Sequence, residues 1–307
     1  MDKLDVDLLM ELQYRFPLVP EPYKEVAERL RITEDEVIKR ITKLQGVIKR
    51  IGAYISFRAM GKISALVAAR VEDVDEVSRR LIPDDDVSHC YERDHYFNLW
   101  YVIKSKSREE LSDKVRAQLG GCEHHILYSR RTYKLSVKFD LIEGVSRSPP
   151  EILPEEIPRL EGFDEFLSAI RRIPISRRPF KEIGLKLGMS EDEVIKKIEK
   201  LISTGAVRDF GAALDGDLIG FSQNYMLLIS SDEPDEVCRR IALEFPEATH
   251  VVLREVPENW RYNCYAMVHS RSREKADEII SRIISDLSLR DYLPLMSRRN
   301  LKPGVIR

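Results

Sequence analysis

TEDEVIKRITKL, residues 33–44, decides how this chain folds, because nearly the same string, SEDEVIKKIEKL, returns at residues 190–201. Nine of the twelve positions are identical, and two of the others exchange Thr for Ser and Arg for Lys. The likeness continues in GVIKRIGA at 46–53 against GAVRDFGA at 205–212. Self-similarity of this extent indicates that the chain duplicates a unit of about 150 residues.

Each copy begins with helical signals. In the first, Thr33 and Glu36 match the S/T-x-x-E pattern of a capping box, and apolar residues follow at helical spacing. Apolar residues at helical spacing also precede this box, between residues 6 and 30. Helix, helix, turn and capped helix is the order of a winged helix-turn-helix, so the sequence predicts one at the start of each copy.

The rest of each copy alternates strand-like with helix-like runs. In the first copy the order is KISALVAARV, DEVSRRLI, a strand pair within residues 87–103 that breaks near Asp94, SREELSDKVRAQL and HHILYSRRTYKLSVKF. This β-α-β-β-α-β order is the ferredoxin-like plan, in which an antiparallel sheet carries both helices on one face. The second copy repeats it and ends in SRRNLK, residues 297–302, where the first has SRRTYK, residues 129–134. The face of each sheet that carries no helix must be covered by something else.

The predicted class is therefore α+β, in two tandem units. The prolines and acids of VSRSPPEILPEEIP suit an extended linker between the copies. The expected boundaries are a first winged helix-turn-helix at 1–52, a first ferredoxin-like domain at 53–144, the linker at 145–158, a second winged helix-turn-helix at 159–211 and a second ferredoxin-like domain at 212–307.

Composition excludes several classes of protein. A chain of 307 residues with a net charge of −2 has room for several domains and no overall attraction to nucleic acid. The N-terminus is acidic and no apolar run is long enough to span a membrane, so we expect a cytoplasmic protein. The cysteines show no C-x-x-C spacing, which predicts free thiols and neither a zinc site nor a disulfide framework; they are Cys90, Cys122, Cys238 and Cys264.

The strand pairs carry charges that a buried sheet tolerates poorly. The first copy reads VSHCYERDHYFNLWYVI over residues 87–103, and the second places His250 and Arg254 where the first has His89 and Arg93. Residues two and four apart in a strand share a face. The sequence therefore predicts that each His and Arg point together toward whatever covers the open face, with Tyr91 or Val252 between them.

A winged helix-turn-helix followed by a ferredoxin-like domain resembles the Lrp/AsnC family of regulators. The strand-pair motifs HCYERDHYFNLWYV at 89–102 and REVPENWRYNCYAMVHSRS at 254–272 resemble more closely those of the siroheme decarboxylases, an AsnC-like branch. The resemblance implies two related subunits fused in one chain. It further implies loss of the acetate carboxylates at C12 and C18 of siroheme, giving 12,18-didecarboxysiroheme in alternative heme or heme d1 biosynthesis, without an added cofactor. Cys264 replaces the family's usual leucine, and this departure, like Val252, suggests that one pocket is weaker.

The reaction needs a proton donor and cations. His89 and His250 are the predicted general acids, because imidazole changes charge near neutral pH; the alternative for either ring is contact with the substrate iron. Arg93 and Arg254 are the predicted ligands of siroheme's carboxylates, since a guanidinium fork matches a carboxylate. No resident metal site is expected.

Further substrate contacts are predicted with their alternatives left open. For the aromatic residues the alternative is core packing, for His95 a local hydrogen bond, and for the arginines an exposed salt bridge. The set is Tyr91, His95, Tyr96, Asn98, Trp100, Tyr262, Asn263, His269, Arg131 and Arg299. His124 and His125 lie outside the repeated pattern and are interpreted as surface or packing residues.

Two other functions compete with the enzyme. A ligand-responsive transcription regulator would use the same fold, but TEDE and SEDE place acids at the helix end that normally approaches DNA, so DNA binding is not expected. A siroheme carrier would use the same pocket without catalysis. We expect the halves to pair through their sheets, and a homodimer of the fused chain as a further assembly.

Overall fold

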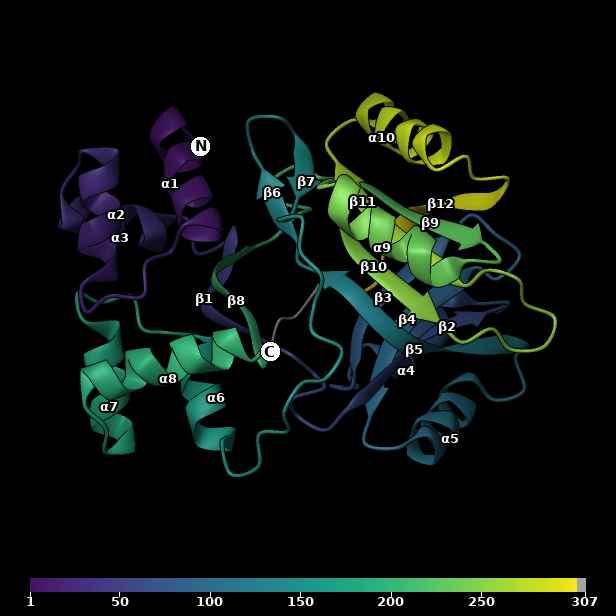
Figure 1. Ribbon diagram of the computed structural model, residues 1–307, viewed down its shortest axis with the longest axis horizontal. Coiled ribbons are helices and arrows are strands. Elements are labelled where there is room, and N and C mark those ends of the chain that lie inside the picture. The colour runs from purple at the N-terminus through teal and green to yellow at the C-terminus, as the bar shows by residue number, and fades with distance from the viewer. Residues whose placement is uncertain (303–307) are drawn as a thin grey trace. The chain divides into compact units, whose positions relative to one another are not determined.

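The computed structural model describes residues 1–302 and separates the chain into two compact units, whose elements are labelled in Figure 1. The first unit joins both helix-turn-helix segments, in residues 1–60, 138–143 and 156–220. The second joins both ferredoxin-like domains, in residues 61–137, 144–155 and from 221 onward. No helix within residues 1–302 has the length and apolar character to cross a membrane.

The first unit contains three helices and one long strand from each copy, together with one short strand. Its helices are α1 (Lys3–Tyr14), α2 (Pro22–Leu30), α3 (Glu34–Lys43), α6 (Asp164–Arg171), α7 (Pro179–Leu187) and α8 (Glu191–Ser203). Strand β1 (Ile48–Ile55) pairs antiparallel with β8 (Val207–Leu214), and the short β6 (Lys138–Asp140) also belongs here. The wing is thus one strand from each copy, and both strands cross the boundaries expected at 52 and 211.

The helix caps follow the sequence with one difference. Ser190 and Glu193 form the full capping box of α8. In α3 only half of the box forms, because the Thr33 hydroxyl accepts from the Glu36 N–H while the Glu36 carboxylate accepts from Arg40 instead. One cap bond is enough to begin the helix at the expected residue.

The second unit contains both β-α-β-β-α-β domains in the expected order. The first has β2 (Ile63–Ala69), α4 (Val74–Leu81), β3 (Val87–Arg93), β4 (Leu99–Ser105), α5 (Arg108–Leu119) and β5 (His124–Leu135). The second has β9 (Gln223–Ser230), α9 (Pro234–Glu244), β10 (Ala248–Arg254), β11 (Cys264–Ser270), α10 (Arg273–Asp286) and β12 (Asp291–Asn300). The strand orders are β5-β2-β4-β3 and β12-β9-β11-β10.

The two sheets join at both edges and close into a ring. Strand β3 pairs with β12, and β5 pairs with β10, both antiparallel. This edge pairing confirms that the halves meet through their sheets. The residues expected to form a linker begin with β7 (Val145–Arg147), where Val145 pairs with Ser270 of β11. Part of that segment therefore belongs to the ferredoxin-like unit.

Alternation along the strands divides the side chains between three cores. One core lies between the first sheet and helices α4 and α5, and a second lies between the other sheet and helices α9 and α10. The third gathers residues of both halves on the sheet faces that carry no helix, including Leu66, Trp100, Leu228 and Tyr265. Each sheet therefore covers the open face of the other, and we call this shared face the inner face.

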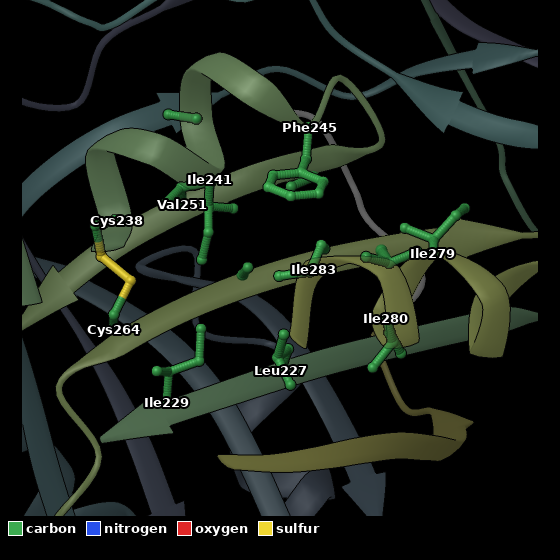
Figure 2. Close-up of a cluster of buried hydrophobic side chains, with 14 of the residues drawn as sticks. Leu227, Ile229, Cys238, Ile241, Phe245, Val251, Cys264, Ile279, Ile280 and Ile283 are labelled. Carbon is green, nitrogen blue, oxygen red and sulfur yellow. A yellow bond between two sulfur atoms is a disulfide. The ribbon is translucent and has the colours of Figure 1, made fainter. Parts of the chain in front are cut away.

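The prediction of four free thiols is wrong for Cys238 and Cys264, which form a disulfide with a Cα–Cα distance of 5.8 Å. Figure 2 shows the bond joining helix α9 to strand β11 inside a hydrophobic cluster. The two cysteines are 26 residues apart in sequence, and only the packing of α9 on the sheet brings them together. Cys90 and Cys122 are free.

The disulfide predicts a thiol count. Protein unfolded without a reductant should react with a thiol reagent at Cys90 and Cys122 only, and at all four cysteines after reduction. The Cys238→Ser variant should expose one additional thiol, Cys264, before reduction. Four reactive thiols in the unreduced wild type would contradict the bond.

The close approach of strand β8 to helix α1 predicts a packing defect when a side chain is added at Gly211. A Cβ added at Gly211 would lie 2.6 Å from the Leu12 carbonyl oxygen, whereas one added at Gly46 meets nothing within 4 Å. We expect Gly211→Ala to lower the free energy of unfolding by about 1–3 kcal/mol, because backbone cannot give way as a side chain can. Gly46→Ala is the matched control and should change it little. Urea unfolding followed by circular dichroism measures both, and equal midpoints would refute the close contact.

Candidate functional site on the inner face

The predicted His, Tyr and Arg of strand β3 do share the inner face. The rings of His89 and Tyr91 stack with centroids 6.4 Å apart, and the Arg93 guanidinium lies 5.2 Å from the centre of the Tyr91 ring. Cys90, between them in sequence, packs into the helix-covered core instead. Simple strand alternation therefore placed these three residues correctly.

The corresponding residues of β10 occupy the same kind of position. His250 pairs with Met267 and Val252 pairs with Tyr265, and both of those partners belong to the inner core. The Arg254 guanidinium lies 5.2 Å from the centre of the Tyr265 ring. The two copies therefore present similar His-x-x-x-Arg strands to one shared interior.

The two arginines fasten the sheets together. Arg93 donates from Nη1 to the Leu295 carbonyl at 2.7 Å and from Nη2 to the Asn224 side-chain oxygen at 3.1 Å, both in the other half. Arg254 donates from Nη1 to the Leu127 carbonyl at 3.0 Å and to the Ser129 hydroxyl at 3.1 Å. Each fork reaches across the junction between the sheets.

The expectation that Arg93 and Arg254 hold substrate carboxylates stays a prediction beside this role at the junction. Their exposed fractions are only 3% and 8%, and acceptors of the protein bind both terminal nitrogens of Arg93 and the Nη1 atom of Arg254. Burial lowers the pKa of both to about 10, so both remain charged at neutral pH. Neither Nε atom has a hydrogen-bond partner among residues 1–302. Their positive charge acts on the interior, and their hydrogen bonds join the two sheets.

A second group of imidazoles lies beside His250. The His250 and His269 ring centroids are 6.3 Å apart, and the Thr249 hydroxyl lies 3.3 Å from Nδ1 of each ring. Burial, together with the nearby Arg93 and His89, lowers the pKa of His269 to about 4. His269 is therefore neutral at pH 7, and it shares its surroundings with residues of the other half.

Sequence reasoning missed Thr249 and Asn224. Thr249 could have been found, because a hydroxyl residue precedes the paired histidine in both copies, as Ser88-His89 and Thr249-His250. Asn224 gave no such signal. It stands in an otherwise apolar strand and receives Arg93 only because the sheets join.

An aromatic cluster fills another part of the inner face. Trp100 donates from its indole nitrogen to the Phe97 carbonyl at 2.6 Å, and its ring lies 5.9 Å from that of Trp260 and 6.0 Å from that of His95. The His125 ring centroid lies 4.9 Å from that of Trp260 with the two planes tilted, as expected of a packing residue. Core packing thus accounts for Trp100.

His95 and the amides occupy turns. His95 Nδ1 accepts the Phe97 N–H at 3.1 Å, and burial lowers its pKa. Asn98 bonds the backbone N–H and C=O of Val71, and Asn263 bonds those of Ser231 in the same way. These local bonds hold each turn against the neighbouring strand and give the amides a structural role.

Tyr96 and Asn98 precede strand β4, which begins only at Leu99, so they do not share a strand face with Trp100. Tyr96 is 57% exposed and donates to Glu123 at 2.7 Å, away from the inner core. Tyr262 does belong to that core. Only part of this predicted set therefore lines the inner face.

Arg131 and Arg299, the predicted substrate arginines of the last strands, form ion pairs with carboxylates of the protein. Arg131 pairs with Glu155 at 3.3 Å, and Arg299 pairs with Asp75 at 2.9 Å and with Glu92. Their expected contact with the substrate stays a prediction, while an ion pair engages each side chain, at an exposed position for Arg299 and a partly buried one for Arg131. This was the alternative that the sequence left open.

The basic residues of the helix-turn-helix segments also have partners. Arg40 of α3 contacts the carboxylates of Asp2 and Asp5, and the Lys197 ammonium lies 4.4 Å from the centre of the Phe166 ring. At the start of α3, Asp35 pairs with Arg177 at 2.7 Å. These contacts reduce the free positive charge that a DNA phosphate backbone would need.

The part of the chain that the structure describes offers no set of ligands for a resident metal ion. No group of three or more His, Cys, Asp or Glu side chains is arranged there to hold a metal ion.

Two family models match the chain. A model described as AsnC-like ligand binding domain matches residues 59–134 and 218–302. A model described as siroheme decarboxylase NirDL-like HTH domain matches residues 5–48 and 169–208. Each model matches twice, in agreement with the duplication.

Individual proteins give the same result. The chain is 30% identical to the siroheme decarboxylase of Hydrogenobacter thermophilus, over 98% of this chain and 93% of that protein. It is 36% identical to the siroheme decarboxylase beta subunit of Methanosarcina barkeri, over 44% of this chain and 90% of that subunit. A crystal structure of the siroheme decarboxylase NirDL in co-complex with an iron-uroporphyrin III analogue superposes with a TM-score of 0.68 at 27% identity, over 98% of this chain and 93% of the other.

The hydrogen bonds of Arg93 across the junction predict a loss of stability when this arginine is replaced. Replacing Arg93 by Ala leaves the Leu295 carbonyl and the Asn224 amide without their buried donor, so the free energy of unfolding should fall by roughly 2–5 kcal/mol. Arg299→Ala, which breaks only exposed ion pairs, should change the unfolding midpoint little. Thermal unfolding compares the two, and equal loss in both variants would contradict the assignment.

Proposed function

Because this chain belongs to the siroheme decarboxylase family, in its single-chain form, we propose that it is a carboxy-lyase that releases carbon dioxide from siroheme. Two acetate side chains, at C12 and C18, become methyl groups, and the product is 12,18-didecarboxysiroheme. The reaction takes place without an added cofactor and belongs to alternative heme or heme d1 biosynthesis. The iron-tetrapyrrole analogue bound by the NirDL relative supports a tetrapyrrole substrate.

The observation that carries the proposal is the presence of His89 and His250 at equivalent positions on one inner face. Each stands opposite a residue of the neighbouring inner strand, Val102 for His89 and Met267 for His250. Imidazole is suited to proton transfer at neutral pH. Two proton donors in one interior match a substrate that loses two carboxylates.

The chemistry requires one proton for each carbon dioxide. When the bond between the methylene carbon and the carboxylate breaks, its electron pair remains on the methylene carbon, where the conjugated ring delocalises it. An imidazolium then delivers a proton to that carbon, and the side chain becomes a methyl group. His89 and His250 are proposed as these donors, one for each acetate.

Binding of the polyanion relies on charge and on apolar surface. Arg93 and Arg254 remain positive in a poorly solvated interior, where a charge acts over a longer range than in water. Tyr91, stacked on His89, is proposed to contact the plane of the macrocycle, and His269 to meet a polar substituent. Trp100 and Tyr262 shape the inner face.

Single histidine variants test the proton donors. We expect His89→Ala and His250→Ala each to accumulate product that has lost one carboxylate, because only one donor remains, while affinity for siroheme in a spectral titration stays within about threefold. A rate loss of about 10²–10⁴-fold is the usual effect of removing a general acid. Anaerobic turnover followed by mass spectrometry measures both.

His124→Ala is the matched control, since His124 contacts the Cys122 carbonyl and lies outside the inner core. Wild-type product from both histidine variants would refute the donor assignment. Binding without loss of any carboxylate in the wild type would identify a carrier, and tight sequence-selective DNA binding at physiological salt would favour a regulator instead.

A further inference from the structure

We propose that Thr249 is a positioning residue that sets which ring nitrogen of His250 and His269 carries the proton. The inference rests on the proposed function and deepens it, because it makes the two proton donors of the chain unequal. It starts from one hydroxyl group that lies 3.3 Å from Nδ1 of both imidazoles.

A β-bulge brings the three side chains together. In the pairing of β10 with β11, Ala248 stands opposite Val268 and His250 opposite Met267, so Thr249 is the additional residue. A bulge interrupts the alternation of side chains and re-aims the extra one. Thr249 therefore reaches the neighbouring His250 and, across the strand, His269, instead of pointing to the opposite face.

The number of protons on the hydroxyl determines which nitrogen of each imidazole carries a proton. The Thr249 hydroxyl also contacts the Met267 carbonyl at 3.3 Å, and a carbonyl can only accept. A hydroxyl has one proton and two acceptor lone pairs. If that proton goes to Met267, both imidazoles must donate from Nδ1 to the Thr249 oxygen. In the neutral form of either ring, Nε2 is then the nitrogen without a proton.

Because Thr249 is buried, groups of the protein decide how its hydroxyl is hydrogen-bonded. The exposed fraction of Thr249 is 0%, so water does not compete for its hydroxyl. Its backbone carbonyl accepts the Ser136 N–H at 2.9 Å, which anchors the bulge to the adjoining strand. His269 is neutral at pH 7 and thus has a single N–H, whose location matters.

The other copy has the bulge without the second imidazole. Ser88 is the additional residue between Val87 and His89, and its hydroxyl donates to the Val102 carbonyl at 3.5 Å. Lys104 stands two residues beyond Val102, as His269 stands two beyond Met267. An ammonium group offers donors only and has no tautomers. Hydroxyl control of a pair of imidazoles therefore belongs to the His250 copy alone.

Nuclear magnetic resonance of the full chain, with ¹⁵N-labelled histidine and no tetrapyrrole, tests the proposal directly. We expect Nδ1–H signals for His250 and His269 in the wild type, assigned with His250→Gln and His269→Gln. Thr249→Val keeps the branched shape but removes the hydroxyl, so Nε2–H signals should appear for both rings. Thr249→Ser should restore the wild-type pattern. Unchanged tautomers in Thr249→Val would overturn the proposal.

Turnover provides the second readout. Thr249→Val should slow the loss of one of the two carboxylates about tenfold, accumulate the singly decarboxylated product and leave siroheme affinity within about twofold. Ser88→Ala is the matched control and should not accumulate that product. Thr249→Ser should recover the wild-type rate; equal slowing of both steps in Thr249→Val would also count against the proposal.

The two readouts separate the two hypotheses. A wild-type protein that releases no carbon dioxide defeats the proposed function, while the imidazole spectra still decide the role of Thr249. If Thr249→Val does not fold, Thr249→Ala removes the same hydroxyl with less bulk, and its spectrum takes the place of the valine variant's.

Discussion

Closure of the two sheets into one ring is the constraint on which the ferredoxin-like unit depends. Alone, each domain would expose an unpaired edge strand and an uncovered apolar face, both of which favour aggregation. Strands β5 and β12 have 12 and 10 residues, long enough to pair within their own sheet and then across the junction. The duplication therefore supplies within one chain the partner that each sheet requires.

Closure also explains why arginine is tolerated at the junction. Where the two sheets meet, the guanidinium of Arg93 donates to the Leu295 carbonyl and that of Arg254 to the Leu127 carbonyl. A buried cation with several acceptors costs far less than one without. The junction thereby leaves positive charge beside neutral imidazole, a combination that a polyanion can complete.

The sequence predicted the elements and much less of the site. The repeat and the caps located the helices, and strand alternation placed His89, Tyr91 and Arg93 on one face, because these depend on neighbours in sequence. The partners of Arg93 and the disulfide of Cys238 with Cys264 depend on contacts between distant segments, which no local pattern encodes. Tyr96 lies in the turn between β3 and β4, and the aromatic run alone did not indicate that the second strand begins only at Leu99.

The copies agree at the junction and differ inside it. Leu295 and Leu127, which accept from the two arginines, stand at equivalent positions before SRR in each copy. Bonding through backbone carbonyls and a guanidinium must satisfy the same geometry twice for the ring to close. No such requirement falls on the interior, where Lys104 takes the place of His269 in the other copy and Tyr91 takes the place of Val252. A closed ring can therefore hold its halves in matching geometry while the groups between them specialise for successive steps on one substrate.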